Sequence, residues 1–117
     1  MWLDKLGSSA QLGIEVVIKQ SVFGGNYALI NNDLEPNPCW WISVFFKKFV
    51  TGKNININSS ENIRAYANCV SSYEKKTTIV IYGMNIKSEP IKFRIKGLKK
   101  ESKLSCFIFT SDDLLSQ

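Results

Sequence analysis

The sequence predicts an α/β segment followed by an all-β segment, with the boundary near residue 50. Two observations lead to this expectation. Apolar residues of the first part recur at helical spacing on both sides of one short apolar run, Ile14 to Ile18. Past Thr51 and Gly52 the hydrophobic period changes from about 3.6 residues to about 2, the period of a half-buried strand. We therefore expect two structural parts, residues 1–50 and 51–117.

The first part should begin with a helix and continue into a strand. One helical face is formed by Trp2, Leu3, Leu6 and Ala10. Gly13 is placed to end this helix, because glycine adopts the left-handed conformation common just past a helix C-terminus. The run from 14 to 18 is almost wholly apolar, as in a strand buried on both faces of a parallel sheet. Its one acid, Glu15, is expected to form a structural ion pair or a cap.

A second helix should close the first part. Pro36 and Pro38 precede it, and proline is favoured in the first helical turn. Its apolar stripe is formed by Trp41, Val44, Phe45 and Phe49. Lys47 and Lys48 lie near its C-terminus, where positive charge complements the helix dipole. The order helix, strand, loop, helix is that of the end of a β/α unit.

The second part has the alternation of antiparallel strands. The expected strands are 63–69, with Ile63, Ala65, Ala67 and Cys69 on one face; 77–82; 91–96; and 104–108, with Leu104, Cys106 and Ile108 on one face. Their spacing and the turn residues between them indicate part of an antiparallel β-sandwich. One β/α unit closes no barrel and a few strands make only part of a sandwich, so the chain is expected to be a piece of a larger fold.

Composition excludes several kinds of site. The chain has 117 residues with no histidine and three cysteines, which excludes a zinc site of the usual kind, a Ser-His-Asp triad and a Cys-His pair. No metal or cofactor is expected. No run approaches the roughly 20 apolar residues that cross a bilayer, and the N-terminal residues lack the basic start and apolar core of a signal peptide.

Charge is uneven along the chain. Residues 1–46 carry two lysines and four acids, a net charge of −2, whereas residues 47–117 carry thirteen Lys or Arg and six acids, a net charge of +7. A basic second half can meet a polyanion such as a sulfated glycan or an anionic lipid, or it can be a solvated lysine-rich surface. Binding of nucleic acid through Lys92, Arg94 and Lys96 is a weaker alternative.

The loop after the expected strand, Gln20 to Tyr27, is the candidate site. In barrels of β/α units the chemistry lies in the loops that follow the strands. Gly24 and Gly25 let the backbone turn tightly or approach a ligand closely, and Gln20 and Tyr27 offer hydrogen-bonding groups on either side. The alternative is a plain glycine turn.

Ordered stretches of the chain carry a family resemblance. They are Trp2-Leu3-Asp4-Lys5-Leu6-Gly7, Gly13-Ile14-Glu15-Val16-Val17, Gln20, Gly25-Asn26-Tyr27, Phe46-Lys47-Lys48, Ile63-Arg64-Ala65-Tyr66, Cys69 and Ile79-Val80-Ile81-Tyr82. In this order they resemble the C-terminal third of the heparanases, retaining endo-β-glucuronidases of glycoside hydrolase family 79. The resemblance is dense to about residue 50 and thinner after it.

The resemblance implies a fold and a site. Residues 1–50 would be the end of a (β/α)8 TIM barrel, with its last strand and flanking helices, and 51–117 part of a C-terminal β-sandwich. Gly25 would donate its N–H, and Tyr27 its hydroxyl, to the carboxylate of the uronic acid that is cleaved. Gln20 would contact a neighbouring sugar, although the chain is one residue shorter than the family between Gln20 and Tyr27, which leaves its orientation open.

Other implications concern residues outside this loop. Both catalytic glutamates of the family lie on earlier barrel strands, which would precede Met1, so the chain alone is expected to be inactive. The family counterpart of Cys69 forms a disulfide with a cysteine near the full-length C-terminus. Asn58-Ser59-Ser60 is a glycosylation sequon, meaningful if the parent protein is secreted or lysosomal, as the family is.

Two functions remain open from the sequence. The resemblance favours part of an enzyme that acts on heparan sulfate, hyaluronan or another glucuronide, with the rest of the parent barrel and sandwich as its structural partner. The alternative is a non-catalytic module in which the basic β part holds heparan sulfate or another polyanion without cleaving it. Cys39 and Cys106 have no assigned role in either case.

Overall fold

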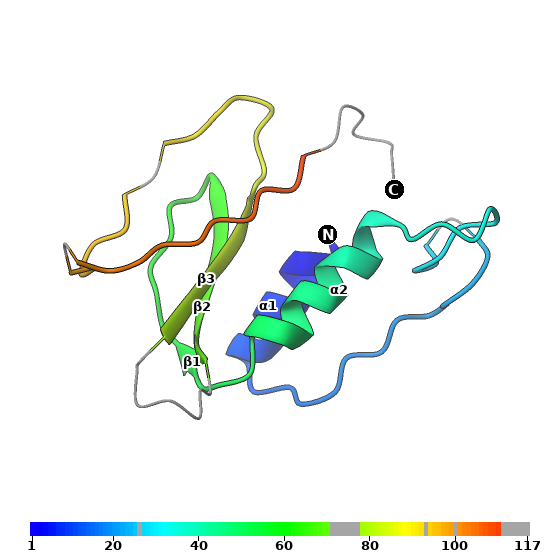
Figure 1. Cartoon of the computed structure of the whole chain (residues 1–117), viewed down its shortest axis with the longest axis horizontal. Coiled ribbons are helices and arrows are strands. Elements are labelled where there is room, and N and C mark those ends of the chain that lie inside the picture. The colour runs from blue at the N-terminus through cyan, green and yellow to red at the C-terminus, as the bar shows by residue number, and fades with distance from the viewer. Residues whose placement is uncertain (26, 71–77, 93, 100, 111–117) are drawn as a thin grey trace.

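A computed structural model shows a mixed α/β chain with two helices and one small sheet (Figure 1), and it describes residues 1–25, 27–70, 78–92, 94–99 and 101–110. The elements are α1 (Trp2–Gln11), α2 (Pro38–Phe49), β1 (Asn54–Ile55), β2 (Ile63–Val70) and β3 (Thr78–Asn85). The three strands are antiparallel and lie in the order β1-β2-β3. Across the described segments, neither helix has the length and hydropathy needed to cross a bilayer.

Helix α1 ends where the sequence predicts. Gly13 has φ +74° and donates its N–H to the Ala10 carbonyl at 3.2 Å, and Ile14 donates to the Ser9 carbonyl at 2.9 Å. These two bonds satisfy carbonyls that a helix C-terminus otherwise leaves unpaired, in the arrangement that a left-handed glycine permits. The stop at Gly13 is therefore confirmed.

Helix α2 also begins and ends as predicted, but only half of its apolar stripe is packed. Pro38 occupies the first turn after the extended Asn37, and Lys47 and Lys48 occupy the last turn. The Phe45 and Phe49 rings lie 5.1 and 5.7 Å from the Phe107 ring. Trp41 and Val44, which complete the stripe, remain exposed.

The sheet is short and is covered by helix α1. Helix α1 contacts all three strands and also α2 (Figure 1). Helix α2 reaches the sheet as well, because the Phe46 ring lies 5.6 Å from the Tyr82 ring. Tyr66 of β2 pairs with Tyr82 of β3, and Ala65 pairs with Gly83. A Cβ at Gly83 would overlap the Arg64 carbonyl, so this close strand approach requires glycine.

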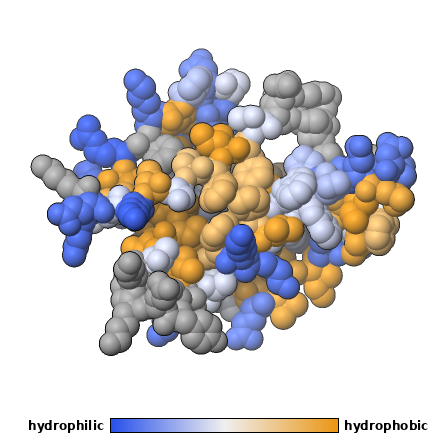
Figure 2. Space-filling view, in the orientation of Figure 1, coloured by the Kyte–Doolittle hydropathy of each residue, from blue (hydrophilic) through white to orange (hydrophobic). Residues whose placement is uncertain are grey.

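The chain buries little of its apolar surface. Its radius of gyration is 15.4 Å, whereas a compact domain of this length has about 13 Å. Its accessible surface is 10357 Å², against about 6,500 Å² for a folded monomer of the same mass. The buried apolar core among the described residues is Leu6, Ala28, Tyr66 and Ala67. Figure 2 shows hydrophobic residues gathered over the middle of one face with hydrophilic residues around them, so much apolar surface is exposed, as expected for a piece of a larger fold.

The strand expected over 14–18 is not formed. These residues run as an isolated extended segment between α1 and the loop (Figure 1), and Ile14, Val16 and Ile18 are 51%, 72% and 78% exposed. A parallel strand needs neighbouring strands for its backbone hydrogen bonds, and the described residues offer none here. Glu15 likewise has no ion pair with any residue that the structure describes.

The described residues of two further expected strands form no hydrogen-bonded ladder. Residues 91, 92 and 94–96 are outside any strand, although Ile91 and Ile95 are less exposed than Lys92 and Arg94 between them. Residues 104–108 are also unpaired, and the face that packs is not the predicted one. The Phe107 and Phe109 rings contact Phe45 of α2 but remain 58% and 55% exposed, and Leu104 and Ile108 are more exposed still. Ring contacts with a helix, rather than pairing with a strand or burial, hold this segment.

Candidate functional site

The candidate site is the loop after the extended segment, which lies on the side of the molecule away from the sheet (Figure 1). Gln20 is exposed, Gly25 has φ +77°, and the Tyr27 side chain is 67% exposed. Asn26, which lies between them in the Gly-Asn-Tyr motif, is outside the described residues. The sequence therefore presents two of the three expected binding residues within one turn.

Local hydrogen bonds hold the first half of this loop. The Ser21 hydroxyl donates to the Phe23 carbonyl at 2.6 Å, which closes the turn that precedes the two glycines. Ile30 donates its N–H to the Val22 carbonyl at 2.9 Å, and Phe23 and Ile30 form an isolated parallel bridge. These contacts bring residue 30 back beside residues 22 and 23, so the glycine turn projects from a hydrogen-bonded loop base.

Hydrogen bonds from Asn37, the residue before helix α2, hold the second half of this loop. The Asn37 side chain donates to the Ala28 carbonyl at 2.9 Å, and its N–H donates to the Leu29 carbonyl at 2.8 Å. Ala28 is fully buried. Asn31 Oδ1 accepts from the N–H groups of Asp33 and Glu35, the Asx-turn geometry that the Asn-Asn-Asp sequence favours. Tyr27 is thus followed directly by Ala28, which is buried and hydrogen-bonded to Asn37.

The polar groups at the tip have no partner within the described chain. Neither the Gly25 N–H nor the Tyr27 hydroxyl donates to any described residue. A Cβ built on Gly25 would meet no atom, so the backbone on this side is open to an approaching ligand. Free donors of this kind would suit a carboxylate, because donation to an ionised group is stronger than donation to a neutral one.

Packing does not explain Tyr27. A core tyrosine is mostly buried, and its hydroxyl usually has a hydrogen-bond partner. Tyr27 has neither property among the described residues. Gln20 is exposed as well, and no described contact joins its side chain to Gly25 or Tyr27. The structure brings Gly25 and Tyr27 together through the Ala28 N–H to Gly25 carbonyl bond, at 3.3 Å, and does not link Gln20 to them.

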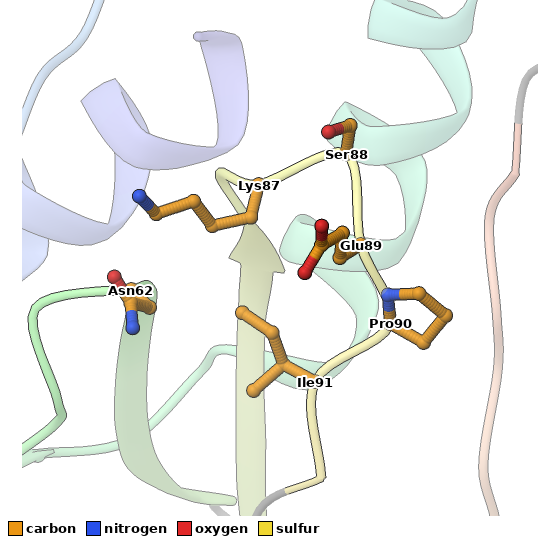
Figure 3. Close-up of a pocket in the computed structure, with 6 residues that line it drawn as sticks. All are labelled: Asn62, Lys87, Ser88, Glu89, Pro90 and Ile91. Carbon is orange, nitrogen blue, oxygen red and sulfur yellow. The ribbon is translucent and has the colours of Figure 1, made fainter.

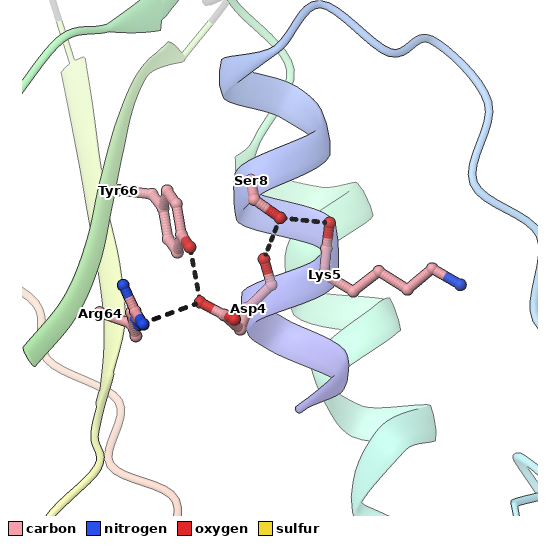
Figure 4. Close-up of polar contacts among 5 residues, drawn as sticks. All are labelled: Asp4, Lys5, Ser8, Arg64 and Tyr66. Atoms are coloured by element: carbon pink, nitrogen blue, oxygen red, sulfur yellow. Dashed lines mark hydrogen bonds and ion pairs between the residues drawn. The ribbon is translucent and has the colours of Figure 1, made fainter.

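A polar contact that the sequence did not predict joins α1 to β2 (Figure 4). The Tyr66 hydroxyl donates to Asp4 Oδ1 at 2.6 Å, and Arg64 Nε lies 4.0 Å from the same oxygen. Burial, together with the Asp4 carboxylate, raises the pKa of Tyr66 to about 12. Gly7 allows this approach, since a Cβ there would overlap the Tyr66 ring. We call Asp4, Gly7, Arg64 and Tyr66 the helix–sheet contact.

The helix–sheet contact continues across the sheet. The Tyr66 and Tyr82 rings stack at 5.6 Å, and the Tyr82 hydroxyl donates to Asn68 Oδ1 at 3.0 Å. The Asn68 amide donates to the Gly52 carbonyl at 3.1 Å. Alternation placed Tyr66 and Asn68 on the polar face of their strand, yet both are buried with Ala67, so both faces of β2 are covered. The only sequence signal for this contact was the placement of Asp4, Gly7 and Ser8, two polar residues and a glycine, on adjoining faces of one helix.

The remaining candidate residues are placed but not linked to one another. Cys39, Cys69 and Cys106 are all free thiols, with Cys69 half-buried on β2 and Cys106 exposed. Asn58 and Ser60 of the sequon are exposed, as glycosylation requires. Lys92, Arg94 and Lys96 are exposed and form no ion pair within the described segments. No group of three or more metal-ligating side chains occurs among the residues that the structure describes.

Comparison with known proteins gives clear similarities. The chain is 42% identical to the heparanase of Rattus norvegicus over 94 residues, which is 74% of this chain and 18% of that protein. It is 32% identical to the hyaluronoglucuronidase of Hirudo nipponia over 121 residues, 94% of this chain and 24% of that protein. It is 24% identical to inactive heparanase-2 of Homo sapiens over 118 residues, 86% of this chain and 20% of that protein.

These similarities support a heparanase-like origin for the sequence. No family model matches the chain. The chain spans about a fifth of the length of the curated relatives that it matches. The relatives include proteins named heparanase or hyaluronoglucuronidase and others named inactive heparanase-2.

Proposed function

We propose that this chain is part of a heparanase-like retaining endo-β-glucuronidase of glycoside hydrolase family 79, acting on a glucuronic-acid glycosaminoglycan. The observation that carries the proposal is the similarity to a heparanase and to a hyaluronoglucuronidase over most of the chain. The Gly25 N–H and the Tyr27 hydroxyl, which have no partner among the described residues, support it, because a uronic acid offers the carboxylate that both groups suit.

The proposed architecture is the end of a (β/α)8 barrel in residues 1–50, followed by part of a β-sandwich in 51–117. Residues 14–18 would be the last barrel strand, and their exposed apolar side chains and unpaired backbone support this assignment. Residues 104–109 would likewise gain cover in the complete sandwich. Chains produced as 1–117 alone are therefore expected to associate, since exposed apolar faces and strand edges pair with one another.

The proposed mechanism divides the work between this chain and the rest of a longer protein. Retaining glycosidases use two carboxylates about 5 to 5.5 Å apart, one as acid and base and the other as nucleophile. We assign these to glutamates on earlier barrel strands. Gly25 and Tyr27 would hold the uronate carboxylate so that the glycosidic bond meets those glutamates, and Gln20 would contact the adjacent sugar. No cofactor is needed for this chemistry.

The expected substrates are heparan sulfate and hyaluronan, the glycans to which the names of the relatives point. Both contain glucuronic acid, so a carboxylate clamp serves either one. The basic charge of residues 47–117 favours the more heavily charged heparan sulfate by long-range attraction. The exposed sequon at Asn58 supports a secreted or lysosomal location, and Cys69, a free thiol in this chain, would form its disulfide with a cysteine of the longer protein.

The test is a cleavage assay on the longest protein that contains this chain. Heparan sulfate and hyaluronan are incubated with it, and the products are sized by chromatography. We expect endo-cleavage of at least one glycan and none by residues 1–117 alone, which would lack an acid and a nucleophile. Cleavage by the pure 117-residue chain would contradict the division of roles, and absence of cleavage by the longer protein would reject the enzymatic function.

A non-catalytic glycan-binding module is the second candidate. The similarity to inactive heparanase-2 favours it, together with the net charge of +7 in residues 47–117. This candidate predicts retention of the longer protein on immobilised heparan sulfate, with affinity that falls steeply as salt rises, and no shortening of the glycan. The cleavage assay therefore separates the two candidates directly.

A further inference from the structure

We propose that the hollow beyond the paired ends of β2 and β3 is a second saccharide-binding subsite, separate from the Tyr27 loop. The described residues that line it are Asn62, Lys87, Ser88, Glu89, Pro90 and Ile91 (Figure 3). Its volume of about 360 Å³ lies toward the lower end of the roughly 300–1,000 Å³ of small-molecule sites. The choice of a glucuronic-acid glycan as ligand rests on the proposed function.

The loop that forms the hollow is organised by one residue, Asn85. Its amide donates to the Glu89 carbonyl at 2.7 Å, and its Oδ1 accepts the Lys87 N–H at 2.9 Å. Ile86 donates its N–H to the Asn62 carbonyl at 3.5 Å, so the strand pair continues up to the hollow. The backbone that presents Lys87 and Glu89 is thus held in place before any ligand arrives, which lowers the entropic cost of binding.

The polar side chains around the hollow have their hydrogen-bonding capacity free. The Asn62 amide, the Lys87 ammonium, the Ser88 hydroxyl and the Glu89 carboxylate make no hydrogen bond or ion pair with any described residue. Figure 3 shows Asn62, Lys87 and Glu89 placed around the same space, with Ile91 below it. A ligand there can use donors and acceptors together.

The chemistry of this lining fits a sugar residue. Lys87 and Glu89 have opposite charges, so the hollow does not select a ligand by net charge. Sugar hydroxyls donate to a carboxylate and also accept from an amide or an ammonium group. Ile91 points toward this space and offers an apolar contact to the C–H face of the ring, and Pro90 lies at the rim (Figure 3). A uronic acid adds a carboxylate for Lys87, and this bond is charge-assisted.

The hollow and the Tyr27 loop lie on opposite sides of the molecule. In Figure 1 the segment after β3 lies on the sheet side, and the Tyr27 loop lies beyond α2 on the other side. The hollow therefore cannot contact the same sugar as Gly25 and Tyr27. It would hold a distant part of a long glycan or a separate chain.

Binding is measured by saturation-transfer NMR with a hyaluronan tetrasaccharide, a method that observes the ligand and tolerates association of the chain. The variants are Lys87→Ala and Glu89→Gln, with Lys103→Ala as the matched control, because Lys103 is exposed and lies outside the lining. Lys87→Ala should weaken binding about tenfold, as expected for one charge-assisted bond, and Lys103→Ala less than about twofold. Circular dichroism checks that each variant keeps its fold.

Glu89→Gln gives the sharpest result because two explanations predict opposite signs. Removal of this negative charge raises the net charge from +5 to +6, so binding by general attraction would strengthen. Loss of a hydroxyl acceptor in a built subsite would weaken it severalfold. Stronger binding by Glu89→Gln, equal losses in the two lysine variants, or no binding by the unaltered chain would each overturn the proposal. The readout is binding rather than cleavage, so failure here and failure of the proposed enzymatic function are distinguishable.

Discussion

The helix–sheet contact and the Tyr27 loop each place a tyrosine beside a glycine, with opposite results. Tyr66 is 8% exposed, stacks on Tyr82 and donates to Asp4. Glycine is the only residue type that fits at position 7 beneath the Tyr66 ring. Tyr27 is 67% exposed, and Gly25 beside it has open space on its Cβ side. The same pair of residue types serves packing in one region and leaves free donors in the other.

The difference shows which group is available to a ligand. Every polar atom of Tyr66 is used within the chain, so this tyrosine contributes to stability. The hydroxyl of Tyr27 is used by no described residue, so its contribution to stability is small and its donor remains free. Exposure combined with an unused donor is thus the reason for proposing Tyr27, and not Tyr66, as a binding residue.

The largest expected effect tests the two glycines. Gly7→Ala should lower the free energy of unfolding by about 3 kcal/mol, since the new Cβ overlaps the Tyr66 ring, with Cγ 2.6 Å away. Gly25→Ala should cost only about 1 kcal/mol, for its left-handed backbone, because nothing crowds its Cβ. Urea denaturation followed by tryptophan fluorescence compares the two variants. Equal losses would mean that the close approach at Gly7 is not maintained in solution.

Tyr27→Phe should affect catalysis and leave stability unchanged. In the longer protein, loss of one charge-assisted hydrogen bond of about 1.5 to 3 kcal/mol corresponds to a roughly ten- to hundredfold fall in kcat/KM. The melting temperature should barely move, because the ring is retained and the hydroxyl has no described partner. Glycan cleavage kinetics and thermal denaturation are measured on the same preparation. Lower stability with unchanged kcat/KM would reject the substrate role of Tyr27.

Alkaline pH should weaken the helix–sheet contact. The pKa of Tyr66 rises from 10.0 to about 12 on folding, so its contribution is complete below pH 10 and is lost as pH rises towards 12. This rise in pKa corresponds to a loss of about 3 kcal/mol over this window. Burial also raises the pKa of Tyr82 to about 12, which adds to the effect. Urea denaturation at a series of pH values measures it.

Tyr66→Phe is the control for the pH experiment and the smallest expected change. It removes one hydrogen bond to a partly exposed carboxylate and should cost about 1 kcal/mol at neutral pH. Its stability should then fall less steeply between pH 10 and 12 than that of the unaltered chain. An identical pH dependence in both proteins would show that Tyr66 is not the titrating group.

Local signals in the sequence determined the helices and the best strand of this protein. Gly13 and Pro38 mark helix boundaries through backbone conformations that depend on a single residue, and both were predicted correctly. The alternation over 63–69 predicted β2, and the β-branched run ending at Tyr82 predicted most of β3, whose expected start at Thr77 is outside the described residues. The exposed Gly-Asn-Tyr turn was a candidate because glycine and a polar aromatic follow an apolar run.

Only the tertiary structure decided which extended segments became strands and which tyrosine was left free. Residues 14–18, 91, 92, 94–96 and 104–108 have strand-like patterns but form no ladder, because a strand requires hydrogen-bond partners that a pattern of side chains does not contain. The bond from Tyr66 to Asp4 joins positions 62 residues apart, so no local period could reveal it. Side-chain pattern sets local conformation, whereas pairing and burial depend on distant parts of the chain.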